Sequence, residues 1–105
     1  MITVADAIKR IQKKHPNECI VSGLDMGNFY AFWILGRSVN PMSILEIPVG
    51  STMQAIRKST GEEFLYSPFH SEEGTPKGDI DITPYLSSGD AAFAKKIRKM
   101  IENGV

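Results

Sequence analysis

The sequence predicts an α+β fold, with an N-terminal helix packed on an antiparallel meander sheet and a helix at the C-terminus. Apolar residues recur at helical spacing near both ends of the 105-residue chain. Between these ends lie segments rich in β-branched and aromatic residues, separated by turn-forming residues. A chain of this length is about one domain, so we predict a single domain over residues 1–105.

The first helix is expected over residues 3–15. Thr3 and Asp6 have the spacing of a capping box, and Pro16 ends the helix because a proline disfavours helical backbone in the residue before it. One face of this helix carries residues at helical spacing: Val4, Ile8, Ile11 and His15.

A β-hairpin is predicted next, with strands over residues 18–24 and 29–36. The turn is Asp25–Asn28, in which Gly27 or Asn28 takes a positive φ. The second strand is apolar on both faces, which is typical of a central strand, so another segment, a ligand or a second subunit must cover its second face. Phe29, Ala31, Trp33 and Leu35 point one way, and Tyr30, Phe32 and Ile34 point the other.

The middle of the chain predicts three more strands. One is expected at Ile44–Val49, and a second hairpin pairs Thr52–Arg57 with Glu62–Tyr66. Thr60 and Gly61 belong to the turn of this hairpin, and Gly61 is at the position that needs a left-handed backbone.

The last third of the chain predicts a loop, a short extended segment and a helix. The loop covers residues 67–78, and "DIDITPYL" supplies the extended segment. Ser88 or Asp90 is expected to be the N-cap of the final helix. Its apolar stripe consists of Phe93, Ile97, Met100 and Ile101.

The charge of the chain argues against nucleic acid and anionic membranes as partners. The 12 basic and 12 acidic side chains cancel, so no net field attracts phosphate. The apolar stretch 19–36 is interrupted by polar and glycine residues and is shorter than the ~20 residues of a membrane span. The N-terminus lacks the apolar core of a signal peptide, so we predict a cytoplasmic protein.

No pattern in the sequence points to catalysis, a metal ion or a cofactor. The single cysteine, Cys19, sits in an apolar strand and is expected to be a buried hydrophobe. Neither a nucleophile elbow nor a phosphate-binding glycine loop is present. We therefore predict a protein that is not an enzyme and binds no cofactor. The spacing of the acidic and histidine residues in the second half matches no metal site: His70, Glu72, Glu73, Asp79 and Asp81.

Two segments resemble a group of small bacterial and phage proteins. "CIVSGLDMGNFYAF" is similar to the D-x-G-x-F-Y-x-F hairpin of this group, and "PVGSTMQAIRKSTGEEFLY" is similar to its K-x-T-G-E hairpin. The resemblance implies a cystatin-like fold. Members of the group tend to come from phage or prophage structural gene clusters, and YrhB-type immunity proteins have a similar fold. The chain departs from the group in its longer acidic loop, residues 67–82, and in a lengthened C-terminal helix.

Three functions follow as hypotheses. The first is a non-catalytic protein-interaction domain, of phage or prophage origin, that forms a homo-oligomer such as a dimer through its sheet. Its predicted contact residues are Tyr30, Phe32, Trp33, Ile34 and Tyr66.

The alternative is a cytosolic toxin-immunity protein that binds through an acidic surface. That surface would comprise Glu62, Glu63, Glu72, Glu73, Asp79 and Asp81. The third hypothesis is a small-ligand binder that uses the concave side of the sheet, lined by Tyr30, Trp33 and Tyr66.

Overall fold

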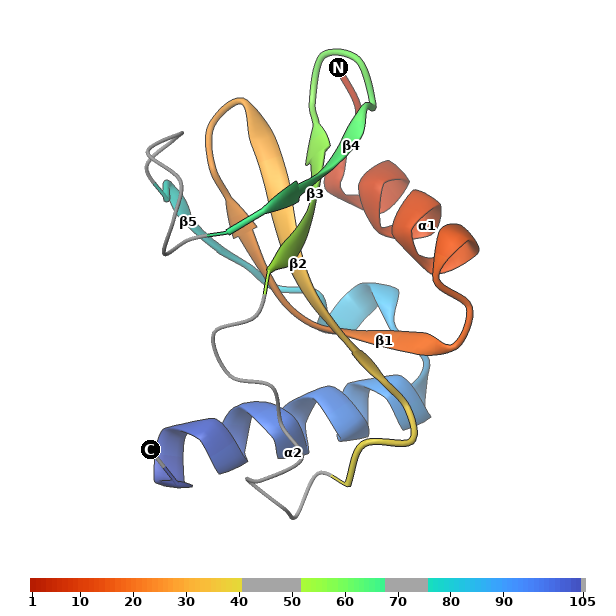
Figure 1. The fold of residues 1–105 in the computed structure, drawn as a ribbon, viewed down its shortest axis with the longest axis vertical. Helices are drawn as coiled ribbons and strands as arrows, with labels where there is room; N and C mark the ends of the chain where they lie inside the picture. The colour runs from red at the N-terminus through yellow and green to blue at the C-terminus, as the bar shows by residue number, and fades with distance from the viewer. Residues whose placement is uncertain (41–51, 68–75, 105) are drawn as a thin grey trace.

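The computed structural model describes all residues except 41–51, 68–75 and 105. Within the described residues the chain forms two α-helices, one 3-10 helix and a five-stranded antiparallel sheet, which confirms the predicted α+β class (Figure 1). The strand order in the sheet is β4-β3-β2-β1-β5. In chain order the elements are α1 (Val4–Lys14), β1 (Glu18–Asp25), β2 (Phe29–Gly36), β3 (Met53–Arg57), β4 (Glu63–Tyr66), β5 (Gly78–Ile80), η2 (Thr83–Tyr85) and α2 (Ser88–Gly104).

Helix α1 has the predicted capping box. The side-chain oxygen of Thr3 accepts a hydrogen bond from the Asp6 N–H, and the Asp6 carboxylate accepts one from the Thr3 N–H. The helix ends at Lys14, before Pro16, as the sequence predicts. Its buried residues pack on the sheet and are Ala7, Ile8 and Ile11.

The turn between β1 and β2 is built around Gly27. This glycine has a φ of +91°, and its N–H donates to the Asp25 carboxylate over 2.9 Å. Among the described residues only glycines have positive φ, so Gly27 and not Asn28 takes the left-handed conformation. The Asn28 carbonyl instead accepts a hydrogen bond from the Lys58 N–H, which ties this turn to the neighbouring hairpin.

The turn between β3 and β4 follows the same principle. Gly61 has a φ of 75°, as predicted, and its N–H donates to the Arg57 carbonyl. The Thr60 hydroxyl accepts a hydrogen bond from the Glu62 N–H over 3.2 Å. Both predicted hairpins are therefore confirmed, with strand ends that differ from the prediction by at most one residue.

The two helices cover opposite faces of β2. On one face, Tyr30 and Phe32 pack with the buried side chains of α1, and Ile34 packs beside them. On the other face, Leu35 and Trp33 pack against α2 through Ile97 and its neighbours on the predicted stripe. The C-terminal helix thus covers part of the second face.

The rest of the second face is buried in a separate apolar cluster. At its centre the ring of Phe29 meets the rings of Phe64 and Tyr66 edge-on, with centroids 5.1 and 5.2 Å apart. The buried members of this cluster are Met26, Phe29, Ala31, Met53, Ala55 and Tyr66. Both faces of β2 are therefore covered over most of their length, and only Trp33 and Ile34 among its apolar side chains are half-buried.

Strand β1 has a β-bulge at Val21, where a side chain of α2 binds its backbone. The register shifts between Ile20 and Ser22, so Val21 is the extra residue, and β5 pairs only with Gly23–Asp25 beyond it. Arg98 of α2 donates from Nη1 to the Val21 carbonyl over 2.6 Å. A helix side chain therefore satisfies the backbone where the sheet supplies no partner strand.

The N-cap of α2 differs from the prediction. The helix begins at Ser88, and the Ser87 hydroxyl accepts a hydrogen bond from the Asp90 N–H over 3.2 Å. A cap residue precedes the first helical residue and binds an N–H three positions on, so Ser87 is the cap. Our expectation of Ser88 or Asp90 was wrong, because the carboxylate of Asp90 pairs instead with Arg37.

Three predictions fall on residues outside the described part. They concern the strand Ile44–Val49, most of the loop over residues 67–78, and the side chains of His70, Glu72 and Glu73.

Candidate functional site

The structure buries most of the residues that we predicted as contact residues. Tyr30, Phe32 and Tyr66 belong to the core clusters, and Trp33 and Ile34 are half-buried beside them. Side chains that are already packed inside the chain offer no surface to a partner or to a ligand. A contact surface must therefore rest mainly on residues other than Tyr30, Phe32 and Tyr66.

The outer edge of β4 is one of the two edges of the described sheet. The strands of an antiparallel ladder bond alternately to the two sides. The Arg57 N–H donates to the Glu62 carbonyl over 2.8 Å, and Phe64 lies opposite Ala55 of β3. With this alternation, Phe64 and Tyr66 bond toward β3, while the backbone groups of Glu63 and Leu65 point to the outer edge. No other described strand pairs with that edge.

Leu65 is the exposed apolar residue of this edge. It is 70% exposed, more than any other large apolar side chain of the described residues except the terminal Met1. It alternates with Phe64 and Tyr66, whose rings point to the opposite face and pack on Phe29. The strand thus anchors itself through its inward aromatic rings and presents a leucine to solvent.

Two charged side chains beside Leu65 have partners within the chain. Lys14 of α1 forms an ion pair with Glu63, whose side chain is only 10% exposed. Arg57 stacks over the ring of Phe64, with its guanidinium carbon 4.5 Å from the ring centroid. Because these charges have partners, the edge exposes Leu65 without an adjacent unpaired charge from Glu63 or Arg57.

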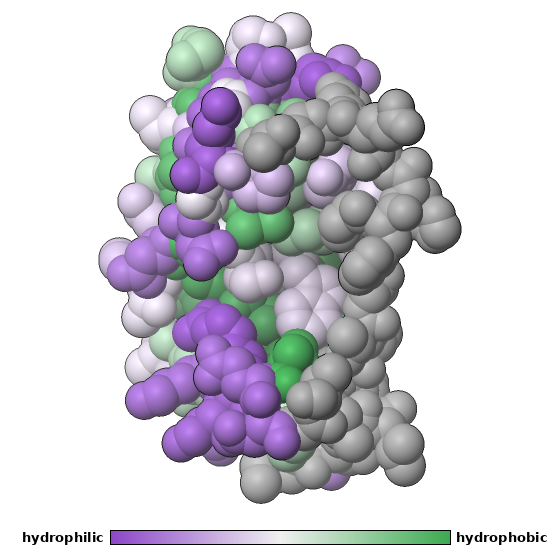
Figure 2. All heavy atoms as spheres, turned by 90° about the vertical axis from the view of Figure 1, so that its left-hand side faces the viewer, coloured by the Kyte–Doolittle hydropathy of each residue, from purple (hydrophilic) through white to green (hydrophobic). Residues whose placement is uncertain are grey.

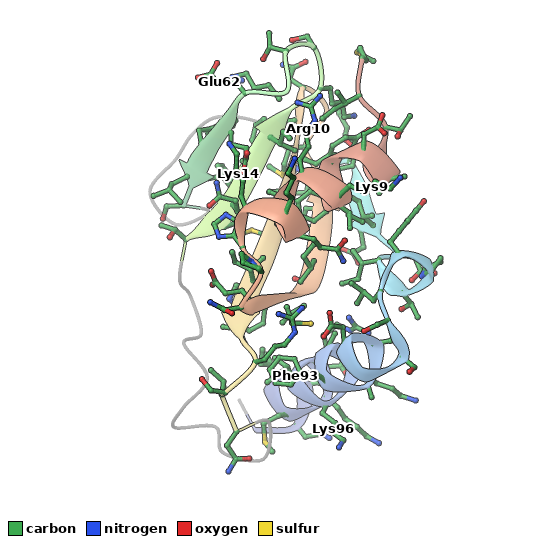
Figure 3. The ribbon with its side chains drawn as sticks, turned by 90° about the vertical axis from the view of Figure 1, so that its right-hand side faces the viewer. Lys9, Arg10, Lys14, Glu62, Phe93 and Lys96 are labelled. Atoms are coloured by element: carbon green, nitrogen blue, oxygen red, sulfur yellow. The ribbon has the colours of Figure 1, made fainter. Side chains whose placement is uncertain are left out.

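Basic side chains on α1 face the same hairpin. Figure 3 shows Arg10 and Lys14 on the side of α1 near the β3–β4 hairpin, which also carries Glu62. Any Cβ atom at Gly61 would collide with the Arg10 guanidinium, so the helix and the hairpin lie in direct contact. These basic residues therefore help to hold β4 in place.

The opposite edge of the sheet is short and polar. Strand β5 has three residues, and the exposed residues around it include Pro76, Lys77 and Asp79. Charge and proline are devices that discourage an edge from pairing, and both lie at β5. The two edges of the sheet therefore have different characters.

An open groove of about 350 Å³ lies beside β5. The ring of Tyr85 is 42% exposed at this groove, and Asp79 and Asp81 supply carboxylates. The Asp25 carboxylate also lines it, but a 2.8 Å ion pair with Lys58 already occupies that group and lowers its pKa. The remaining lining residues are Val4, Lys77, Gly78 and Ile80.

The described residues of the predicted acidic surface lie at two opposite edges of the sheet and do not form a single surface. Glu62 and Glu63 lie at the β4 edge, whereas Asp79 and Asp81 lie at or after β5, the opposite edge of the sheet. The acidic surface of the immunity hypothesis would have to use one edge or the other.

The outer side of α2 is hydrophilic. Phe93 lies on the side of the helix that faces the sheet, and Lys96 points away from it (Figure 3). Hydrophilic side chains gather over the lower part of the molecule, where α2 lies (Figure 2). Lys95 and Lys99 are also exposed, so this helix offers a charged and not an apolar surface.

The described residues show no arrangement typical of metal or thiol chemistry. No group of three or more His, Cys, Asp or Glu side chains in this part of the chain is placed to hold a metal ion. Burial raises the pKa of Cys19 to about 11, and its Sγ lies 3.6 Å from the Asp90 carbonyl oxygen. No helix in the described ranges has the length and apolar character needed to cross a membrane.

Comparison of the chain with family models, curated proteins and solved structures found no match. The resemblance to cystatin-like proteins therefore stays a prediction, whereas the α+β class rests on the structure itself.

Proposed function

We propose that this chain is a non-catalytic protein-interaction domain that binds an extended strand along the outer edge of β4. The observation that carries the proposal is the 70% exposure of Leu65 on an edge whose backbone groups have no described partner strand. Strand addition uses unpaired edge N–H and C=O groups for affinity and alternate side chains for specificity. The packing of β4 on Phe29 and α1 keeps the edge preorganised.

A generic strand peptide tests the availability of this edge. Isotope-labelled protein, diluted until its spectrum no longer changes with concentration, is titrated with a six-residue peptide of alternating Val and Thr. We expect amide shift changes centred on Glu63 and Leu65. The variant Leu65→Pro should abolish them, because it removes an outward N–H without removing a bond to β3. Shift changes confined to other parts of the sheet, or none at millimolar peptide, would contradict the proposal.

A second candidate function, small-ligand binding, is supported by the groove beside β5. Its exposed Tyr85 ring and the Asp79 and Asp81 carboxylates suit a small cationic group, since a cation is attracted both to carboxylates and to an aromatic face. Titration with agmatine, followed through the Tyr85 ring signals, tests this candidate. The double variant Asp79→Asn, Asp81→Asn should weaken the binding, and an unchanged spectrum of the native protein would exclude it.

A further inference from the structure

We infer, resting on the function proposed above, that the strand bound along β4 is β4 of a second copy of this chain. The two copies pair antiparallel about a twofold axis at Leu65. An edge strand presents its N–H and C=O groups in an alternating order, and two identical edges match when one is turned around. The product is a continuous sheet through both copies.

The outward residues restrict the register of this pairing. Glu63 and Leu65 carry the outward N–H and C=O groups. In the pair, each of them must therefore lie opposite Glu63 or Leu65 of the second copy. Two central registers satisfy this rule. Leu65 faces Leu65 of the second copy in one of them, and Glu63 of the second copy in the other.

The side chains distinguish these two registers. The first places one exposed leucine against the other, an apolar match on the exposed face of the strand. The second places each leucine against the Glu63 carboxylate, which is nearly buried beneath Lys14. Burying apolar surface against apolar surface stabilises, and covering a charged pair costs desolvation, so the first register is favoured.

The charge and the sequence of the chain also favour a second copy over an unrelated chain. The formal net charge of the protein is zero, so two copies do not repel each other at long range. The segment Glu63–Tyr66 contains no Lys or Pro, the residues that commonly protect an edge, whereas Pro76 and Lys77 accompany β5. The short strand predicts a modest interface and hence a dimer in reversible exchange with the monomer.

Charge substitutions at Leu65 test the twofold contact by sedimentation velocity. We expect the native protein to approach twice the monomer mass as its concentration rises. Leu65→Lys and Leu65→Glu should each stay monomeric, because like charges would meet across the axis. An equimolar mixture of the two variants should associate again. Ala92→Lys, at an exposed position on α2, is the matched control and should associate like the native protein.

Each other result overturns the inference. A native protein that stays monomeric at millimolar concentration shows that the partner is not a second copy. Stronger association of Leu65→Lys alone shows the register in which residue 65 faces Glu63. If the mixture fails to associate, the two residues at position 65 do not meet at the twofold axis. In all three cases the peptide titration still decides whether β4 binds a strand, so failure of the dimer and failure of the proposed function are distinguishable.

Discussion

Arg37 and Asp90, 53 residues apart in the sequence, are joined by two parallel hydrogen bonds. Arg37 Nε donates to Asp90 Oδ1 over 3.0 Å, and Nη2 donates to Oδ2 over 2.9 Å. The third nitrogen, Nη1, donates to the Pro16 carbonyl over 2.6 Å. One guanidinium therefore links the segment after α1, the end of β2 and the first turn of α2.

Replacing Asp90 with Asn should lower the free energy of unfolding at neutral pH. It should also make that free energy less sensitive to a fall in pH. The Arg37 guanidinium holds the pKa of Asp90 below its ordinary value of 3.8. As the pH falls, the unfolded chain therefore binds protons before the folded chain does, and the contribution of the pair is lost through the folded pKa. Because Arg37 is partly exposed, we expect a cost of about 1 kcal/mol at pH 7.

Urea unfolding of the native protein and Asp90→Asn at several pH values checks this expectation. The stability difference between the two proteins should narrow as the pH falls below about 4. Asp79→Asn, which alters an exposed carboxylate without an ion pair in the described part of the chain, is the control. A difference that stays constant with pH would show that the charge of Asp90 does not stabilise the fold.

Local chemistry explains why much of the fold could be predicted from the sequence. Gly27 and Gly61 indicate turns, because few other residues adopt positive φ. The capping box at Thr3 indicates the start of a helix. The alternation of apolar side chains in β2 gave both faces of that strand correctly. These features depend on residues that are close together in the sequence.

The candidate site depends on relations that local chemistry does not contain. Leu65 looks like any apolar strand residue, and its exposure follows only from the position of β4 at the end of the sheet order. Tyr66 alternates with it and is buried by Phe29, a residue from another hairpin. Likewise, the sequence predicts the apolar stripe of α2. That the stripe packs on Val21 and Leu35 is seen only in the tertiary structure.

Truncation of Ile97 should show that α2 folds together with the sheet. Ile97 is fully buried against Val21 and Leu35, so Ile97→Ala should cost about 2–5 kcal/mol through lost burial and a cavity. Urea unfolding followed by Trp33 fluorescence measures this cost, because Trp33 packs beside the same cluster. The neighbouring exposed residue supplies the control, and Lys96→Ala should change stability by less than about 0.5 kcal/mol. If Ile97→Ala lowered the free energy of unfolding as little as Lys96→Ala does, α2 would contribute little to the core.

Substitution of Gly61 should be costly, whereas substitution of Gly89 should not. Gly61 has a φ of 75°, so Gly61→Ala should destabilise the chain by about 1–2 kcal/mol through backbone strain, while the Arg10 guanidinium that a Cβ would meet is the end of an exposed side chain and can shift. Gly89 lies in α2 with open space around it, and Gly89→Ala should stabilise by about 0.5–1 kcal/mol. Thermal unfolding of both variants gives the comparison. Repeating Gly61→Ala with Arg10→Ala separates backbone strain from the collision, and a neutral Gly61→Ala would refute the backbone strain.

Cys19 should be nearly inert in the folded protein, although it is the only thiol of the chain. Burial raises its pKa from 9.0 to about 11, which leaves ~100-fold less thiolate near pH 8 than an ordinary cysteine has. Labelling with a disulfide reagent at pH 8 should therefore be slow in the native state and fast in urea. The variant Tyr85→Cys adds an exposed thiol as an internal standard, which should react at once while Cys19 does not. Equal labelling rates for the two thiols would mean that β1 separates from α2 far more often than the packing of Ile97 and the bond from Arg98 allow.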